Sequence, residues 1–459
     1  MKQSLLFLFL LFISTSLIAQ QWKIDSVGFG GKPSIVVDGQ DRPHIAFMLE
    51  ETSQNGFIKH AVLENGTFQE TFIDNAYFYG PLAIAADANG FPAIAVHHHD
   101  TENEYVYRWD GVLWEGLVVE SEGHDGWDNS ITFDNNNNIH TSSIDPFQFG
   151  SDEGVEYAFY DGNQWTKESI LAGPTNYEFS TCIQVDSDNV PHIVFYDSVS
   201  DNLIYANKKT GEWRNFIAAN KGGMFASLIL DENNLPHITY YEQVSNEQGK
   251  VHYIRLEGDE WKSEVVDELF NAPIAFTGSR NLTSLAKDAT GKLHLCYGDR
   301  KVMKYATLEE EGWQIDTWLD YTESDIRLGA QTSLAVDSKG QPHITYFELL
   351  STSPVSGNVM YATKPLVSNT QQIVKPEFDF TIHPNPASET ISIEFDLKNM
   401  SQDAQLQLFD LQGKLLRSVD LEQQSTTLNW SISELSDGVY FIRLSTSNQL
   451  VTRELVVDK

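Results

Sequence analysis

The chain has 459 residues and carries 65 acidic against 30 basic side chains, a formal net charge of −35. A long-range field of that sign repels nucleic acid and anionic membranes, so neither is expected as a partner. Beyond the N-terminal leader no stretch is apolar enough to cross a bilayer, and we expect no membrane insertion.

The first residues predict export. Lys2 precedes an apolar run from Leu5 to Ile13, and the small Ala19 stands before Gln20. This is the pattern of a secretory signal peptide over residues 1–19, and its apolar run is too short for a membrane span. We therefore expect a secreted protein, either extracellular or held at the outer cell surface.

The next part of the chain repeats one phrase seven times, and the copy DSKGQPHITYF is the clearest. Successive copies begin 45 to 57 residues apart, which indicates one small supersecondary unit per copy. Alternating apolar positions with many β-branched and aromatic residues are typical of strands. A small residue lies four positions before the Asp that opens each phrase. The copies begin at Asp38, Asp87, Asp134, Asp186, Asp231, Asp288 and Asp337.

The second half of each copy has the pattern of a β-hairpin. VEYAFYDGNQWTKESI, from Val155, and VHYIRLEGDEWKSEVV, from Val251, are each two strands around a tight glycine turn. Each copy is therefore predicted to be a four-stranded antiparallel blade, and seven blades around one axis form an all-β fold, a seven-bladed β-propeller. A tryptophan follows the turn in five copies, at Trp114, Trp165, Trp213, Trp261 and Trp313.

The ends of this region predict how the ring closes. The seventh copy has its third strand at Asn358 to Lys364 and then meets Pro365, so it lacks a fourth strand. QWKIDSV, residues 21–27, matches the fourth-strand pattern of the other copies. We therefore expect the propeller to span residues 20–367 and to be closed by the N-terminal strand.

Two cysteines occur, Cys182 and Cys296, in different copies. They stand where other copies have small or β-branched residues, so we expect packing roles rather than a disulfide.

A polar linker over residues 368–379 leads to a second all-β module at residues 380–459, which fits a small β-sandwich. Its PNP turn (Pro384 to Pro386), DLQGK hairpin, DGVYFIRL strand and basic-then-aliphatic last strand resemble the type A C-terminal sorting domain of the Bacteroidetes type IX secretion system. The resemblance implies export across the outer membrane by the type IX machinery. It also implies removal of this module, followed by release or attachment to surface lipopolysaccharide.

Six copies place a histidine six residues after the opening Asp. A residue that recurs in nearly every blade is expected to have a structural role, and we interpret this histidine as a hydrogen-bond partner of the Asp turn. Functional residues are expected where the repeat is broken. The six histidines are His44, His140, His192, His237, His294 and His343.

The largest departures lie on the face that carries the second-to-third-strand and blade-to-blade connectors, where loop lengths vary most. The second copy reads HHHD at residues 97–100, and the connector into the third copy reads EGHDGWDNS, which contains His124. We expect these two loops to be neighbours. The catalytic candidates are His98, His99, His124, Tyr177, Arg280 and Arg327. The substrate-binding candidates are Tyr79, Trp127, Asp128 and Glu178.

Three interpretations of these residues stay open. They can be a solvated loop cluster, as polar loops commonly are. They can bind a metal through His98, His99 and His124, although the sequence has neither a helical His pair nor a CxxC, and we assign no metal and no cofactor. They can form an active site in which a His or Tyr removes a proton while an Arg neutralises a carboxylate.

The third interpretation suits elimination on a uronic-acid sugar, because a proton α to a carboxylate becomes acidic only when that charge is masked. In fold and residue types the chain resembles the seven-bladed propeller lyases that act on ulvan, an algal polyuronate. The resemblance implies a carbon–oxygen lyase acting on extracellular uronate-containing glycan. The alternative is a non-catalytic surface propeller that binds glycan or protein through rim aromatics such as Trp127, Tyr177 and Phe225. The sequence does not define the oligomeric state.

Overall fold

The chain forms two compact units, residues 1–366 and 367–459. The predicted signal peptide lies outside the described residues, as does the predicted linker up to residue 378. Within the described residues no helix is long and apolar enough to span a membrane. The computed structural model describes residues 22–52, 55–76, 78–119, 126–145, 154–172, 181–245, 248–270, 282–298, 301–324, 327–352, 355–365, 379–396, 404–410, 415–421, 427–445 and 450–459.

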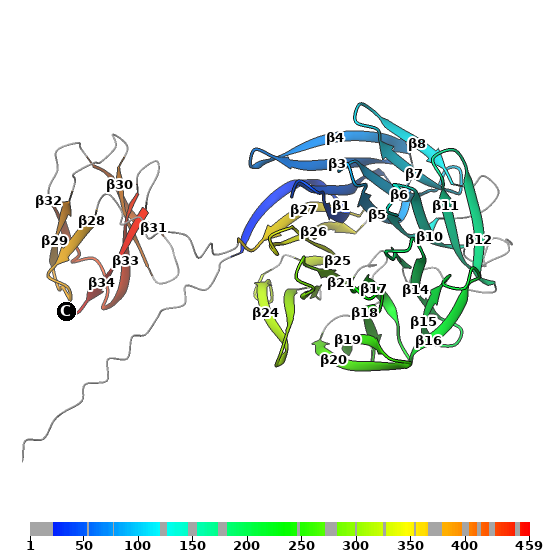
Figure 1. Ribbon diagram of the computed structural model, residues 1–459. Helices are drawn as coiled ribbons and strands as arrows, with labels where there is room; N and C mark the ends of the chain where they lie inside the picture. The colour runs from blue at the N-terminus through cyan, green and yellow to red at the C-terminus, as the bar shows by residue number, and fades with distance from the viewer. Residues whose placement is uncertain are drawn as a thin grey trace, which may run out of the picture. The chain divides into compact units, whose positions relative to one another are not determined.

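The first unit is the predicted β-propeller, with antiparallel blades of four strands set around a central axis (Figure 1). Blades 1 to 3 contain β1 (Lys23–Val37), β2 (Pro43–Thr52), β3 (Asn55–Glu64), β4 (Thr67–Ala76), β5 (Phe78–Ala86), β6 (Pro92–His98), β7 (Asn103–Trp109), β8 (Trp114–Val118), β9 (Trp127–Phe133), β10 (Ile139–Asp145), β11 (Gly154–Tyr160) and β12 (Trp165–Ala172). Blades 4 and 5 contain β13 (Cys182–Val185), β14 (Pro191–Asp197), β15 (Asn202–Asn207), β16 (Arg214–Asn220), β17 (Met224–Leu230), β18 (Pro236–Gln243), β19 (Gln248–Glu257) and β20 (Glu260–Phe270). Blades 6 and 7 contain β21 (Thr283–Lys287), β22 (Leu293–Gly298), β23 (Val302–Glu309), β24 (Gly312–Asp320), β25 (Arg327–Val336), β26 (Pro342–Thr352) and β27 (Val355–Thr363).

Strand β1 closes the ring, as the sequence predicts. Its first half, Lys23 to Gly30, pairs with β27 as the fourth strand of blade 7. Its second half, from Gly31, pairs with β2 as the first strand of blade 1, and β1 lies beside β27 in Figure 1. At the crossing point a Cβ on Gly30 would lie 2.5 Å from the Met48 carbonyl oxygen, so only glycine fits there. One strand therefore belongs to two blades.

The opening aspartate of each repeat organises its turn. In every blade one carboxylate oxygen accepts backbone N–H groups two and four residues later, as Asp186 does from Asp188 and Val190 at 2.9 Å each. The residue three positions after the Asp has a positive φ, which selects Asp, Asn or Gly at that position. The other oxygen faces the repeat histidine, with Nε2 of His192 at 3.2 Å from Asp186. The predicted hydrogen bond between histidine and turn is confirmed for His44, His192 and His294, whereas in the blades of His140, His237 and His343 the two groups lie 3.5 to 3.8 Å apart.

The same histidine links its blade to the next one. In five blades its Nδ1 lies 2.5 to 2.8 Å from a tyrosine hydroxyl on the third strand. Each of these five tyrosines makes a T-shaped contact with an aromatic ring of the following blade. Trp261 packs on Tyr205 in this way, with centroids 5.4 Å apart. Blade 7 obtains its tryptophan from the N-terminus, because Trp22 packs on Tyr305 at 5.2 Å. We call this series of contacts the interblade relay.

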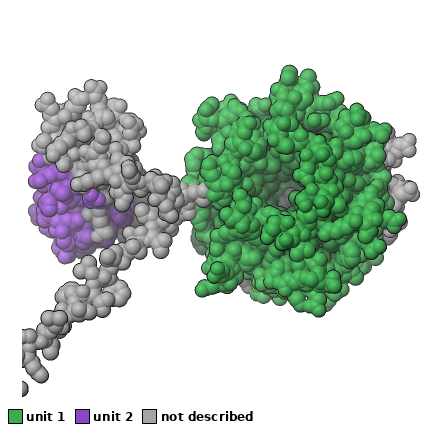
Figure 2. Space-filling model, in the orientation of Figure 1, with its two compact units in different colours: residues 1–366 green, residues 367–459 purple. Residues whose placement is uncertain are grey.

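A second set of contacts joins the innermost strands. In five of the copies the small side chain four positions before the Asp accepts a backbone N–H from the next blade, as Ser130 does from Ile183 at 3.2 Å and Ser333 from Ile35 at 3.2 Å. Cys182 has the same role for the N–H of Leu228 at 3.3 Å. Both cysteines are free, as predicted. These strands line a central cavity of about 180 Å³, and Figure 2 shows the hollow at the centre of this unit.

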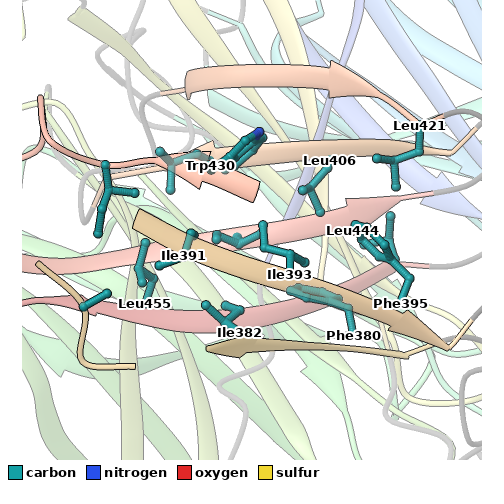
Figure 3. Close-up of a cluster of buried hydrophobic side chains, with 14 of the residues drawn as sticks. Phe380, Ile382, Ile391, Ile393, Phe395, Leu406, Leu421, Trp430, Leu444 and Leu455 are labelled. Carbon is teal, nitrogen blue, oxygen red and sulfur yellow. The ribbon is translucent and has the colours of Figure 1, made fainter. Parts of the chain in front are cut away.

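The second unit is a two-sheet sandwich, in line with the sequence. One sheet has the order β28 (Asp379–His383), β29 (Thr390–Asp396), β32 (Thr427–Ser431). The other has the order β31 (Leu415–Asp420), β30 (Gln405–Phe409), β33 (Gly438–Ser445), β34 (Leu450–Val457). Buried side chains from both sheets, among them Phe380, Ile393, Leu406 and Trp430, pack into one core (Figure 3). In the PNP turn the Asn385 side chain accepts the Val456 N–H at 2.8 Å, which fastens the last strand.

Closure through β1 predicts that Trp22→Ala destabilises the propeller as much as the matched internal change Trp261→Ala. Both rings are half-buried and meet a tyrosine edge-on, so each loss is expected to cost roughly 3 kcal/mol of unfolding free energy. Chemical denaturation of the two variants measures this. A cost for Trp22→Ala near zero, with a large cost for Trp261→Ala, would contradict closure by the N-terminal strand.

The relay predicts a loss of stability in acid. Burial lowers the pKa of all six repeat histidines, for His140 to about 4. Because unfolded histidine titrates near 6.5, the unfolded state takes up protons first, and stability present above that pH is lost as pH falls toward 4. His140 alone should contribute a loss of about 2 kcal/mol between about pH 7.5 and about pH 5. Denaturation at both pH values tests this, and His140→Gln should flatten the dependence.

The sandwich has its own core, so cleavage before it should leave the propeller folded. We expect protein recovered from the culture medium to lack residues 380–459, in line with the resemblance to a sorting domain. Intact mass spectrometry measures this. Secreted material that still ends at Lys459 would contradict removal of the module.

Candidate functional site

The end of β6 departs most from the repeat, and strand alternation separates its three histidines. Ala93 and Ala95 pack against blade 3. His97 continues this row, and its ring lies against Trp127 of β9 with centroids 4.8 Å apart. His98 lies on the other side of the strand, where its ring contacts Tyr105 at 4.8 Å. The sequence HHHD therefore contributes to two sides of one blade.

On the blade 3 side, His97 and His99 converge on one carboxylate. The Nε2 atom of His97 lies 3.4 Å from one oxygen of Glu102, and the Nδ1 atom of His99 lies 3.2 Å from the other. A turn after β6 brings Glu102 back toward the two histidines. The N–H of Glu102 donates to the carbonyl of His99 at 3.3 Å and closes this turn, in which Glu102 has a φ of 54°. His97 is fully buried, whereas the other two are partly exposed. We call these three residues the blade 2–3 cluster.

Further charged groups extend the cluster along the same interface. Glu104, opposite His97 in the strand register, is 2% exposed. Lys167 of β12 lies 2.7 Å from Glu156 of β11. Burial lowers the pKa of Lys167 to about 8, against the opposing effect of Glu104. At neutral pH this lysine still carries most of its positive charge, so the interface holds both signs of charge.

Of the predicted substrate-binding residues, Trp127 and Asp128 are described in full and are buried, at 5% and 0% exposure. Asp128 has a φ of 50° in the irregular start of β9, and its carbonyl accepts the backbone N–H of Thr181 at 3.1 Å. Trp127 therefore supports His97 from within the protein and does not offer a free stacking face. Phe225, a rim aromatic in the binding-module alternative, is also buried, at 1% exposure.

The remaining predicted residues are described in part or not at all. The backbone of Tyr79 in β5 pairs with that of His97, so Tyr79 lies at the same end of blade 2 as the cluster. Arg327 opens β25 of blade 7, where its backbone pairs with Leu349. Four candidates lie outside the described residues, and their roles stay predictions: His124, Tyr177, Glu178 and Arg280.

Sequence reasoning missed His97, Glu102, Glu104 and Lys167 as site residues. Period-two alternation was the available signal, because it pairs His97 with His99 and separates both from His98. The return of Glu102 depends on a turn whose geometry the sequence TENE does not specify. The contribution of Lys167 depends on how two blades pack, which no local pattern encodes.

A second cavity lies between blades 1 and 2, on the face that carries the Asp turns. It has a volume of about 230 Å³ and is lined in part by Arg42, His60, Trp109 and Trp114. Here the repeat is broken as well, because His60 replaces the relay tyrosine and contacts His44 at 2.9 Å. Aromatic rings beside a charged group are suited to holding a sugar ring.

Similarity to known proteins differs between the two units. Residues 381–458 match the family described as the secretion system C-terminal sorting domain. No curated protein matches the chain. Among solved structures, a protein of unknown function from Dyadobacter fermentans is 9% identical over 74% of this chain and 98% of its own, with a TM-score of 0.45.

Two other solved structures are described as sugar-active proteins. An ulvan lyase bound to -[GlcA(1-4)Rha3S]- is 11% identical over 66% of this chain and 79% of its own, with a TM-score of 0.42. The intramolecular trans-sialidase from Ruminococcus gnavus is 10% identical over 74% and 95%, with a TM-score of 0.42. A backbone likeness of this kind does not assign a reaction. Residues 381–458 are a sorting domain of the type IX secretion system, and the protein is secreted or held at the cell surface.

Proposed function

We propose that the propeller acts on an extracellular glycan that contains uronic acid, and that it cleaves this glycan by β-elimination at the rim between blades 2 and 3. The observation that carries the proposal is the blade 2–3 cluster with Glu104 and Lys167 beside it. Ionisable groups are costly to bury, and their concentration in one interblade rim is typical of a working site.

The reaction needs two things from the protein. A base removes the proton from the carbon α to the sugar carboxylate, and a positive charge stabilises the carboxylate as the electron pair moves into the ring. The electron pair forms a carbon–carbon double bond, the glycosidic carbon–oxygen bond breaks, and the leaving oxygen takes up a proton. His124 is the candidate base, with Tyr177 as a further one. Lys167, together with Arg280 and Arg327 from the sequence prediction, is a candidate source of positive charge.

Acidic residues at the ends of several second strands have local partners. Asp197 accepts the N–H of Val199 at 3.0 Å within its own turn. Glu242 lies 2.7 Å from His252. Glu348 accepts the hydroxyl of Tyr321 at 2.7 Å. Hydrogen bonds of this kind hold these carboxylates in structural roles.

Incubation of the secreted protein with uronate polysaccharides, followed by the absorbance of the new double bond, tests the proposal. We expect His124→Ala to lower the elimination rate by roughly 100-fold or more, because it removes a base or a carboxylate partner. The control is His343→Ala, a relay residue that should lower stability and leave the rate per folded molecule nearly unchanged. Equal rates in wild type and His124→Ala would remove this histidine from the mechanism.

The alternative function is glycan binding without chemistry, and the cavity lined by Trp109 and Trp114 is the observation that favours it. The same incubation separates the two functions. Retention of a uronate polymer by the protein, with no double bond formed on any uronate polymer or oligosaccharide, would favour the binding module.

A further inference from the structure

We propose that the blade 2–3 cluster is a metal site, in which His97, His99 and Glu102 hold one zinc ion. Their ligand atoms all lie within 4.8 Å of one another, and among the described residues this is the one group of three or more His, Cys, Asp or Glu side chains that meets this distance. The set differs from the one considered from sequence, because His98 contacts Tyr105 on the other side of the strand.

The spacing of the ligand atoms fits a small tetrahedral ion. Bonds of ~2.0–2.1 Å to zinc place neighbouring ligand atoms ~3.3 Å apart. His97 Nε2 lies 3.4 Å from one oxygen of Glu102, and His99 Nδ1 lies 3.2 Å from the other. With one ligand atom taken from each residue, all three lie within 4.8 Å of one another. The imidazole rings of the two histidines have centroids 5.9 Å apart and are tilted by 55° to one another. Rotation of the partly exposed His99 and Glu102 side chains is the adjustment that we expect to bring three ligands to one ion.

The fold holds these ligands before any ion arrives. His97 is fixed by burial and by the Trp127 ring. The N–H of Glu102 donates to the carbonyl of His99, so the turn ties two ligands together. Ligands that are already positioned lose little conformational entropy on binding, which favours a tight site.

The chemistry of the ligands selects the ion. Two imidazoles and one carboxylate suit zinc, whereas calcium and magnesium prefer an all-oxygen shell. Three protein ligands leave one position open, as in zinc sites that bind water or substrate. We assign this position to water or to the carboxylate of an acidic sugar. The sugar part of this assignment rests on the proposed function, and the metal site itself does not.

Calorimetric titration of full-length protein, stripped of metal by a chelator, with zinc chloride tests the site. We expect one zinc ion per chain, and His99→Ala and Glu102→Gln should each weaken binding at least about 10-fold. Two controls should bind like wild type. His98→Ala changes the neighbouring residue on the other side of the strand, and His252→Ala removes a histidine that lies against a single carboxylate, Glu242, in the described part of the chain.

Cobalt(II) provides a readout that does not depend on variants. Bound in the zinc position of the wild-type protein, it should give the intense visible absorption of a tetrahedral N,N,O site, and glucuronate should shift that band. Absence of zinc binding, binding that His99→Ala and Glu102→Gln leave unchanged, or calcium bound in preference to zinc would overturn the metal site. A cobalt band that glucuronate leaves unmoved would overturn the sugar assignment of the open position, whether or not the protein catalyses elimination.

Discussion

The propeller depends on a buried neutral imidazole between two fixed partners. In a relay blade the histidine faces the turn aspartate through Nε2 and the tyrosine hydroxyl through Nδ1, as His192 does with Asp186 and Tyr205. A neutral ring satisfies both contacts when Nε2 donates and Nδ1 accepts. The tyrosine is then held in a fixed position against the aromatic ring of the following blade. Turn geometry, blade packing and ring closure thus share one set of hydrogen bonds, and the lowered pKa of each histidine is the consequence of its burial.

Blade 1 keeps the histidine but has His60 in place of the tyrosine, whereas blade 2 lacks both members of the relay. Ala93 stands at the histidine position, and Val106 stands where the register of the other blades has the tyrosine. Both partners are replaced together by small apolar residues that pack against blade 3. Because the histidine and the tyrosine are both absent, neither is left buried without its hydrogen-bond partner. The blade 2–3 interface therefore keeps an apolar base, and its rim carries the ionisable residues.

The sequence predicted the fold well because the fold is repetitive. Seven phrases of similar spacing, a tryptophan pattern and a missing fourth strand were sufficient to predict seven blades and the closing role of residues 21–27. The site was predicted less completely because its geometry is set between blades. The strand period distinguishes His97 from His98, but the return of Glu102 and the approach of Lys167 come from a turn and a packing contact that have no local pattern.

Function and stability make opposite demands at this rim. In the other blades the histidine and aspartate of the relay face one another, whereas His97 and Glu104 are buried ionisable groups outside the relay. Burial of this kind costs free energy unless charges of opposite sign compensate, as Lys167 and Glu156 do for one another at 2.7 Å. A divalent ion between His97, His99 and Glu102 would supply the same compensation for the acidic side of the cluster. Because the ring is closed and its other interfaces are stabilised by packing and hydrogen bonds, the propeller can tolerate the free-energy cost of buried ionisable groups at one interface. A repeat fold can therefore carry a functional site between a single pair of blades.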